Sequence, residues 1–168
     1  DVALVRAVEG AEDREDEGQR AMDARGVGPR DTVIGLAASR RTPFVVAALA
    51  RARELGARTA YITCTPRAEF KLPVDVAICP MVGPEALMGS TRMKSGTAQK
   101  FVLNTLSTGV MILLGRVHSN LMIDMPATNE KLRSRAVRMV ELAAGVTRHV
   151  AVQAMGDAGG NVKLAAVM

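Results

Sequence analysis

The sequence predicts an α/β domain in which a parallel β-sheet carries helices on both faces, in three layers, followed by C-terminal helices. Three short apolar runs, residues 32–37, 59–64 and 74–79, have the composition of buried strands. A helix or a loop of several residues connects each run to the next, which is typical of a parallel sheet. With 168 residues and 48% apolar content, the chain is long enough to bury such a core.

The segment before the first strand favours helix. Residues 2–24 combine charged side chains with a partial apolar stripe, and Gly10 divides the segment into two helical pieces. Residues 26–29 contain two Gly and one Pro and end the helix. We expect the strand at residues 32–37 to be buried on both faces, because its apolar run is continuous. The stripe consists of Leu4, Val5, Val8 and Met22.

The middle of the chain contains a helix between the first two strands and then two loops. Pro43 stands where the first turn of a helix tolerates proline, and Gly56 follows as a terminator, so a helix is expected between them. Residues 66–73 form a loop before the third strand. Residues 80–95 form a longer loop that is rich in Gly and Ser.

The second half of the chain is predicted to be helical. We expect residues 96–114 to form one long buried helix, because their apolar side chains cover more than one face. A further helix covers residues 129–144 and ends at Gly145. The apolar side chains of the long helix are Phe101, Val102, Leu103, Leu106, Val110, Met111 and Leu114.

The end of the chain is predicted to be a separate helical region. Residues 146–155 form another helix, and residues 157–160 contain two Gly that separate this helix from a new helical pattern at residues 161–168. We therefore expect one main domain at residues 1–145 and the start of a small helical region at residues 146–168.

The composition excludes several classes of protein. The longest apolar stretch, around residues 110–114, is interrupted by Gly109 and Gly115 and falls far short of the roughly 20 residues of a membrane-spanning helix. No secretion signal is visible, so we expect a cytoplasmic protein. The formal charge is +5, but the Lys and Arg residues are scattered without interleaved aromatic side chains. A nucleic-acid partner is therefore not expected.

The two cysteines, Cys64 and Cys79, are predicted to be buried free thiols. Neither has a second Cys or a nearby His at the spacing of metal ligands, and both lie in apolar runs. The sequence therefore predicts no metal site.

A polar loop at residues 38–42 is the first candidate for a ligand site. It follows a strand and immediately precedes a helix, which is where open α/β sheets bind ligands. Helix-start amides and the hydroxyls of Ser39 and Thr42 converge there on an anion, and donors at two points favour a phosphate. On the residues alone, capping of the helix by either hydroxyl explains the pattern equally well.

Residues 88–97 form the second candidate. Hydroxyls and cations, among them Ser90, Thr91 and Lys94, are crowded before the long helix. Helix capping and a solvated Lys explain this segment when it is taken alone. Two such segments in one domain nevertheless favour an anionic ligand.

A pair of carboxylates near the N-terminus is the third candidate. Glu9 and Glu12 are three residues apart, so on a helix they share a face and can present a carboxylate to a neighbouring pocket. A charged surface helix gives the same pattern, and the spacing alone is a weak signal for catalysis.

Six segments taken together resemble one known family. The most specific of them is the block at residues 89–100, Gly-Ser-Thr-Arg-Met-Lys-Ser-Gly-Thr-Ala-Gln-Lys. In order and spacing, the six segments resemble the signature of the N-acetylmuramic acid 6-phosphate etherases, which are sugar isomerase (SIS) domain proteins with a flavodoxin-like or Rossmann-like sheet. The resemblance covers essentially the whole chain. The segments are residues 7–13, 37–43, 82–85, 89–100, 120–124 and 127–132.

The resemblance implies a cytoplasmic lyase of cell-wall recycling. Such a lyase removes D-lactate from N-acetylmuramic acid 6-phosphate and leaves N-acetylglucosamine 6-phosphate, with no metal or redox cofactor. In that family the ring-opened sugar loses its C2 proton and the C3 lactyl ether, and water then adds back. This chemistry requires carboxylates as acid and base near the sugar carbons.

The resemblance also implies roles for individual residues. The second Glu of the family's Glu-Gly-Ala-Glu-Asp motif is catalytic and matches Glu12, while Ser39 and Thr42 match the phosphate-loop hydroxyls. A homodimer is expected on the resemblance alone. The further candidates for substrate contacts are Glu85, Ser90, Thr91 and Lys94.

The sequence departs from the family in two respects. Arg40 stands where the family has Gly, and it either adds a charge to the phosphate or strains the loop. The family's first strand with its Gly-Thr-Ser-Gly phosphate loop, and an Ala-Ser-Glu segment that carries the other catalytic acid, are not found in this sequence. We therefore expect the sequence to lack the N-terminal part of the family's domain and its C-terminal tail.

Two other functions stay open on the sequence. A phosphosugar-binding or regulatory SIS protein without catalysis, similar to the glucokinase regulatory proteins, fits the missing acid segment and Arg40, whereas the Glu12 match favours the enzyme. A ketose–aldose isomerase is a weaker alternative, because the block at residues 89–100 is etherase-like.

Overall fold

The computed structural model describes residues 6–168, so Leu4 and Val5 of the predicted apolar stripe lie outside the described residues. The chain divides into two compact units, of which the first ends at Leu103 and the second comprises Asn104–Met168. The expected boundary after Gly145, between a main domain and a small helical region, stays a prediction.

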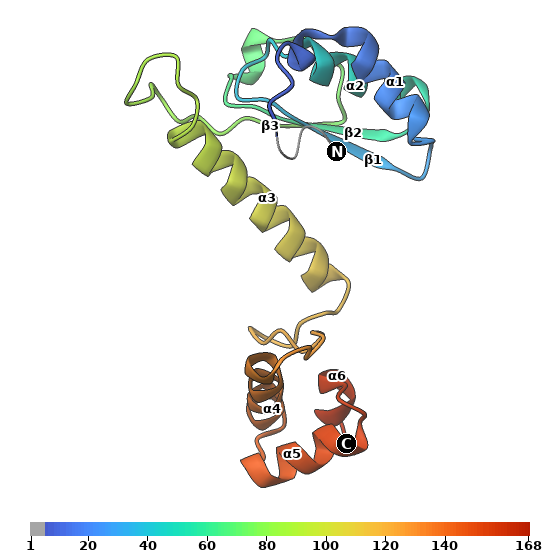
Figure 1. Ribbon diagram of the computed structural model, residues 1–168, viewed down its shortest axis with the longest axis vertical. Coiled ribbons are helices and arrows are strands. Elements are labelled where there is room, and N and C mark those ends of the chain that lie inside the picture. The colour runs from blue at the N-terminus through green and yellow to red at the C-terminus, as the bar shows by residue number, and fades with distance from the viewer. Residues whose placement is uncertain (1–5) are drawn as a thin grey trace. The chain divides into compact units, whose positions relative to one another are not determined.

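The first unit contains a three-stranded parallel sheet in the order β1-β2-β3 (Figure 1). Strand β1 spans Thr32–Leu36, β2 spans Arg58–Ile62 and β3 spans Val76–Ile78. In the register, Gly35 lies opposite Tyr61. The α/β class and the three adjacent parallel strands are thus confirmed, although each strand is shorter than the apolar run that predicts it.

Two helices lie together on one side of this sheet (Figure 1). Helix α2 (Pro43–Glu54) contacts β1 and β2, and α1 (Glu15–Ala24) packs against α2. Gly18 permits this packing, because a Cβ atom there would lie 2.3 Å from the carbonyl oxygen of Phe44. Helix α2 begins at Pro43, as its sequence predicts.

The core of the first unit lies between α2 and the sheet. Leu49 and Tyr61 are each 1% exposed and belong to one apolar cluster with Ala37. Side chains alternate along a strand, and α2 covers the face of β1 that carries Gly35. On the other face Ile34 is 42% exposed. The expectation that the first strand is buried on both faces is therefore wrong at Ile34.

Asp75 fastens β3 to β2 at the end of the sheet opposite the predicted site. Its carboxylate accepts hydrogen bonds from the amide of buried Thr59 at 2.7 Å and from the Thr59 hydroxyl at 3.0 Å. These bonds hold the pKa of Asp75 below its ordinary value. The pair satisfies polar groups that burial leaves without water, and it fixes how the two strands meet.

Helix α3 spans Lys94–Leu113, so the predicted long helix is confirmed. Its predicted burial is wrong: Phe101 is 72% exposed and Leu113 is 89% exposed, and Ser95 is the buried residue of the helix. In the described part of the chain, the other helices pack against the sheet or against one another rather than extensively against α3. A wide apolar stripe on a helix predicts that another segment packs against it, but the stripe does not identify that segment.

The second unit contains three shorter helices, α4 (Glu130–Ala144), α5 (Arg148–Asp157) and α6 (Val162–Ala165). The Asn129 side chain caps α4 by accepting from the Leu132 amide at 2.9 Å, and Gly145 ends the helix with a φ of 67°. Fully buried Ala136, Val140 and Ala151 form the centre of this unit. All three helices lie close to their predicted positions.

Candidate functional site

Most of the predicted site residues lie in the loops that follow the carboxyl ends of the strands. The loop after β1 contains Ser39 and leads to Thr42, at the start of α2. The long loop after β3 contains Glu85 and Ser90 and leads to α3. Because the strands are parallel, their carboxyl ends form one edge, which is where open α/β sheets bind ligands.

The loop between β1 and α2 presents an open helix start. Thr42 occupies the N-cap position of α2, but its side chain makes no capping hydrogen bond. The Arg41 amide donates to Ser39 Oγ at 3.4 Å, and both Ser39 and Arg41 are exposed. The positive end of the α2 dipole is therefore directed at a loop of hydroxyls and cations. This arrangement favours an anion site over capping by Thr42.

Arg40, at the position where the similar family has Gly, does not require a left-handed backbone. In the described part of the chain, the non-glycine residue with a positive φ is Ser119, so the φ of Arg40 is not positive. The Arg40 guanidinium donates to the backbone carbonyl of Glu69 in the 3₁₀ turn η3 (Arg67–Glu69). The charge of Arg40 is thus used within the protein, where it ties the first loop to the segment after β2.

Tyr61 supports the same loop from the core, although no local sequence pattern points to this role. Its hydroxyl donates to the carbonyl oxygen of Ser39 at 3.1 Å, and its ring packs edge-on against Phe70 with 5.4 Å between ring centroids. Burial raises the pKa of Tyr61, so the hydroxyl keeps its proton. A lone Tyr in a buried strand is the sequence signal for such a partner, because buried Tyr hydroxyls usually form a hydrogen bond.

Glu85 has a structural partner in the second candidate segment. Its Oε2 atom accepts from the Lys94 amide and its Oε1 atom from the Ser95 amide, each at 3.0 Å. These backbone amides lower the pKa of Glu85. The carboxylate therefore caps α3, although the residue is nine positions before the helix begins.

The other residues of the second segment are more accessible. Thr91 and Lys94 are exposed, and Ser90 is half-buried, with its amide donating to the Leu87 carbonyl at 3.1 Å. Lys94 also lines a mainly apolar hollow of about 630 Å³ together with Met93. Thr91 and Lys94 are thus accessible to solvent, just before and at the start of α3.

Cys64 connects the two candidate segments. Its amide donates to the Ala38 carbonyl at 3.1 Å, and its thiol lies 4.0 Å from the Ser95 carbonyl oxygen. The structure thereby brings the loop before α2 and the start of α3 to the same edge of the sheet. Both cysteines are free thiols and half-buried rather than fully buried, and burial raises the pKa of Cys79.

Glu12 lies in the 3₁₀ turn η2 (Ala11–Asp13), which begins after Gly10 with a φ of 71°. Its side chain is exposed, and η2 contacts α2, the helix that starts at the first loop. Glu9 precedes Gly10 in a turn, so the two carboxylates do not share a helical face as their spacing suggested.

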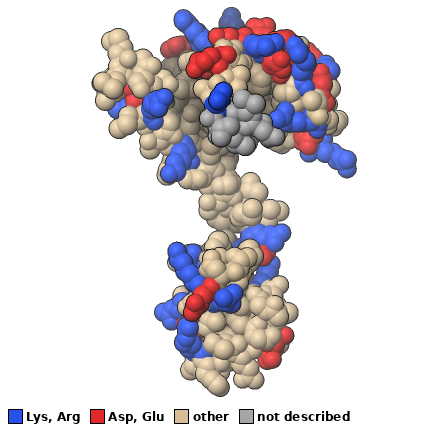
Figure 2. All heavy atoms as spheres, in the orientation of Figure 1, with Lys and Arg blue, Asp and Glu red and all other residues tan. Residues whose placement is uncertain are grey.

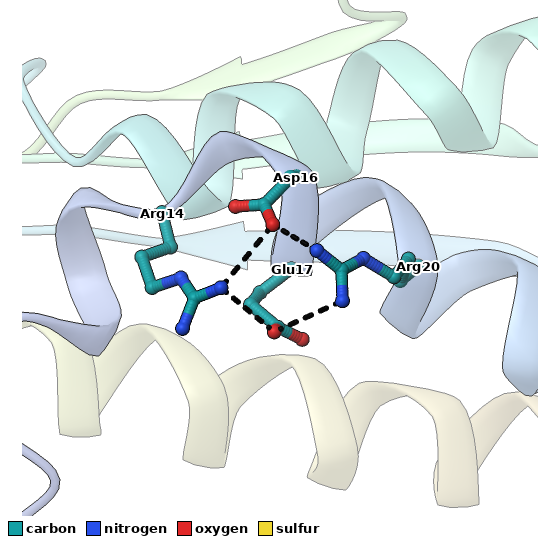
Figure 3. Close-up of polar contacts among 4 residues, drawn as sticks. All are labelled: Arg14, Asp16, Glu17 and Arg20. Atoms are coloured by element: carbon teal, nitrogen blue, oxygen red, sulfur yellow. Dashed lines mark hydrogen bonds and ion pairs between the residues drawn. The ribbon is translucent and has the colours of Figure 1, made fainter.

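A cluster of ion pairs follows Glu12 at the start of α1 (Figure 3). Arg14 contacts Asp16 at 3.3 Å and Glu17 at 3.2 Å, and Arg20 pairs with the same two carboxylates. The Arg14 guanidinium lowers the pKa of Asp16. These acids are thus engaged locally, whereas Glu12 forms no ion pair in the described part of the chain.

The described residues meet neither the requirements of a metal cluster nor those of a membrane-spanning helix. Within residues 6–168 no group of three or more His, Cys, Asp or Glu side chains could hold a metal ion, and no helix is long and apolar enough to cross a membrane. On the face shown in Figure 2, basic side chains of the first unit are interspersed with acidic ones.

Comparison with known proteins supports the resemblance found in the motifs. No family model matches the chain. A curated relative from Symbiobacterium thermophilum is 57% identical over 165 residues, which are 98% of this chain and 55% of that protein. The relative from Cronobacter sakazakii is 54% identical over 99% of this chain and 56% of its own length. A third, from Caldanaerobacter subterraneus subsp. tengcongensis, is 51% identical over 100% of this chain and 55% of its own length.

All three relatives are named N-acetylmuramic acid 6-phosphate etherase. The chain spans about 55% of the length of the first of them. The resemblance predicted from the motifs is therefore confirmed, and the matches cover 98–100% of this chain. The chain is a relative of the N-acetylmuramic acid 6-phosphate etherases and corresponds to part of their length.

Proposed function

We propose that this protein is a carbon–oxygen lyase that acts on N-acetylmuramic acid 6-phosphate. It cleaves the D-lactyl ether at C3, water adds, and the products are N-acetylglucosamine 6-phosphate and D-lactate. The sequence identity of 51–57% to proteins named as this etherase is the observation that carries the proposal. The chain spans about 55% of the length of the first of these relatives.

Within this proposal, the loop before α2 binds the substrate phosphate. The Ser39 and Thr42 hydroxyls donate to phosphate oxygens, and the uncapped start of α2 contributes its partial positive charge. The hydrogen bond from Tyr61 to the Ser39 carbonyl supports the loop from below. A fixed loop loses less conformational entropy when the phosphate binds.

Glu12 is the proposed catalytic acid or base. Removal of the C2 proton and departure of the lactyl oxygen each require proton transfer, and a carboxylate of ordinary accessibility can take or give the proton. The exposed position of Glu12, and the contact of η2 with α2, support this role. We assign Ser90, Thr91 and Lys94 to contacts with the remainder of the substrate.

The wider biology is proposed on the same basis. We expect an SIS domain in a cytoplasmic homodimer that takes part in peptidoglycan recycling and uses no cofactor. The exposed apolar surface of α3, which includes Val110, Met111 and Leu113, supports an interface with a second copy.

The test is release of D-lactate from N-acetylmuramic acid 6-phosphate by the intact protein as its gene encodes it. Glu12→Gln should lower kcat by about 10² to 10⁴, since this is the usual contribution of a general acid or base. Glu15→Gln, three residues after Glu12 and also exposed, is the matched control and should retain activity. An active Glu12→Gln protein removes Glu12 from the mechanism, and absence of D-lactate with wild type refutes the proposed function.

A further inference from the structure

The two helix starts at the candidate site differ in what occupies them. At α3, both oxygens of Glu85 accept backbone amides, from Lys94 and Ser95, each at 3.0 Å. At α2, the N-cap residue Thr42 makes no side-chain capping bond. The amides that a helix leaves unpaired at its start, together with its dipole, attract an anion. Of these two helices, α3 is the one that already has a carboxylate there.

The Glu85 carboxylate binds the start of α3 in the way that a separate anion would. The hydrogen bonds are charge-assisted and use both carboxylate oxygens, and they keep the pKa of Glu85 low, so it remains ionised at neutral pH. The Ser95 amide belongs to a residue that is 4% exposed. The contact also closes the loop at residues 86–93, because its two ends meet through these bonds.

We propose that Glu85 is a positioning residue that serves as an internal anion at the start of α3. It leaves α2 as the helix start that receives the substrate phosphate, and it holds the loop that carries Ser90 and Thr91 in one conformation. This inference rests on the proposed function, because it assigns the two anionic groups of the substrate. Neither the phosphate nor the lactyl carboxylate binds the α3 amides, and the Lys94 side chain is the cation left available there.

The first test is titration of the intact wild-type protein with inorganic phosphate, followed by amide resonances. The Ser39 and Thr42 amides should shift and saturate, while those of Lys94 and Ser95 should not. In Glu85→Ala, the Lys94 and Ser95 amides should become responsive to phosphate, and the bound phosphate per chain should rise from one to two. Glu130→Ala is the matched control, because Asn129 rather than Glu130 caps α4, and it should add no site.

A second variant keeps the inference testable if Glu85→Ala does not fold. In wild type, the Lys94 and Ser95 amide shifts should titrate with Glu85 below its ordinary pKa of 4.5. Glu85→Gln keeps the shape and one acceptor but cannot ionise, so this titration should disappear. Its KM for the sugar phosphate should rise by about three- to fivefold, with a smaller change in kcat, since one charge at a helix start is lost.

The outcomes separate this inference from the proposed function. Phosphate-dependent shifts at Lys94 and Ser95 in wild type, or a Glu85→Ala protein whose α3 amides ignore phosphate, overturn the internal anion and leave the etherase activity intact. The expected phosphate shifts without any release of D-lactate refute the etherase and leave the role of Glu85 standing.

Discussion

The hydroxyl of Tyr61 joins the apolar core to the proposed phosphate loop, and its removal tests that link. Tyr61→Phe keeps the buried ring and its contact with Phe70 but leaves the Ser39 carbonyl without its donor. We expect the free energy of unfolding to fall by about 1 kcal/mol, the usual net value of one hydrogen bond. The KM for the sugar phosphate should rise while kcat changes less. Chemical denaturation measures the loss of stability, and D-lactate release measures KM and kcat. An unchanged KM contradicts the supporting role.

At the residue scale, the sequence indicated the candidate ligand-binding side chains but not the residues that hold their loops in place through hydrogen bonds. Ser39 and Thr42 could be selected because hydroxyls before a helix start are a local pattern. The bonds of Tyr61 to Ser39 and of Glu85 to Ser95 join positions that are 22 and 10 residues apart. Such bonds depend on how the sheet and loops pack, so no local spacing reveals them.

At the scale of elements, the packing of α1 on α2 helps to fix the position of α2, whose start follows the proposed phosphate loop. A Cβ atom at Gly18 would lie 2.3 Å from the Phe44 carbonyl oxygen, which is backbone and cannot rotate away. Gly18→Ala should therefore lower the free energy of unfolding by about 1 to 3 kcal/mol, as overpacking does. It should also weaken phosphate binding, because α2 must shift close to Thr42. Chemical denaturation and phosphate titration measure the two effects.

Gly156→Ala is the matched control for the Gly18 substitution. Gly156 lies in α5, and a Cβ atom added to it would have no other atom within 4 Å, so alanine fits there without a clash. The substitution should stabilise the protein by up to about 1 kcal/mol, because glycine is a poor helix former. If both substitutions stabilise the protein, the contact between α1 and α2 is looser than described.

Elements whose ends have local chemical causes could be predicted, whereas burial could not. Pro43 begins α2, Asn129 caps α4 and Gly145 ends it, and each of these signals is readable in the sequence. The predicted burial of α3 was wrong because apolar side chains on several faces show that a helix needs a cover, not that the described residues provide it.

At the scale of the molecule, the strongest sequence evidence was the resemblance, and the comparisons bear it out over nearly the whole chain. The site it implies is only partly represented in these 168 residues. The resemblance also implies a first phosphate loop and a second catalytic acid, and neither motif is found in this sequence. The loop at Ser39, the turn at Glu12 and the capped start of α3 therefore form one part of the proposed etherase site.

The 168-residue chain expressed by itself should release no measurable D-lactate from N-acetylmuramic acid 6-phosphate. Loss of one general acid alone lowers the rate by about 10² to 10⁴, and loss of a phosphate loop weakens binding as well. A chimera that supplies the preceding part of the Symbiobacterium thermophilum relative should restore activity, and Glu12→Gln should lower it again by about 10² to 10⁴. An enzymatic assay for D-lactate measures the activity of the 168-residue chain, of the chimera and of the chimera with Glu12→Gln. Clear activity of the 168-residue chain would show that its own carboxylates suffice, and the second acid would then have to be sought among the exposed Glu and Asp residues near η2.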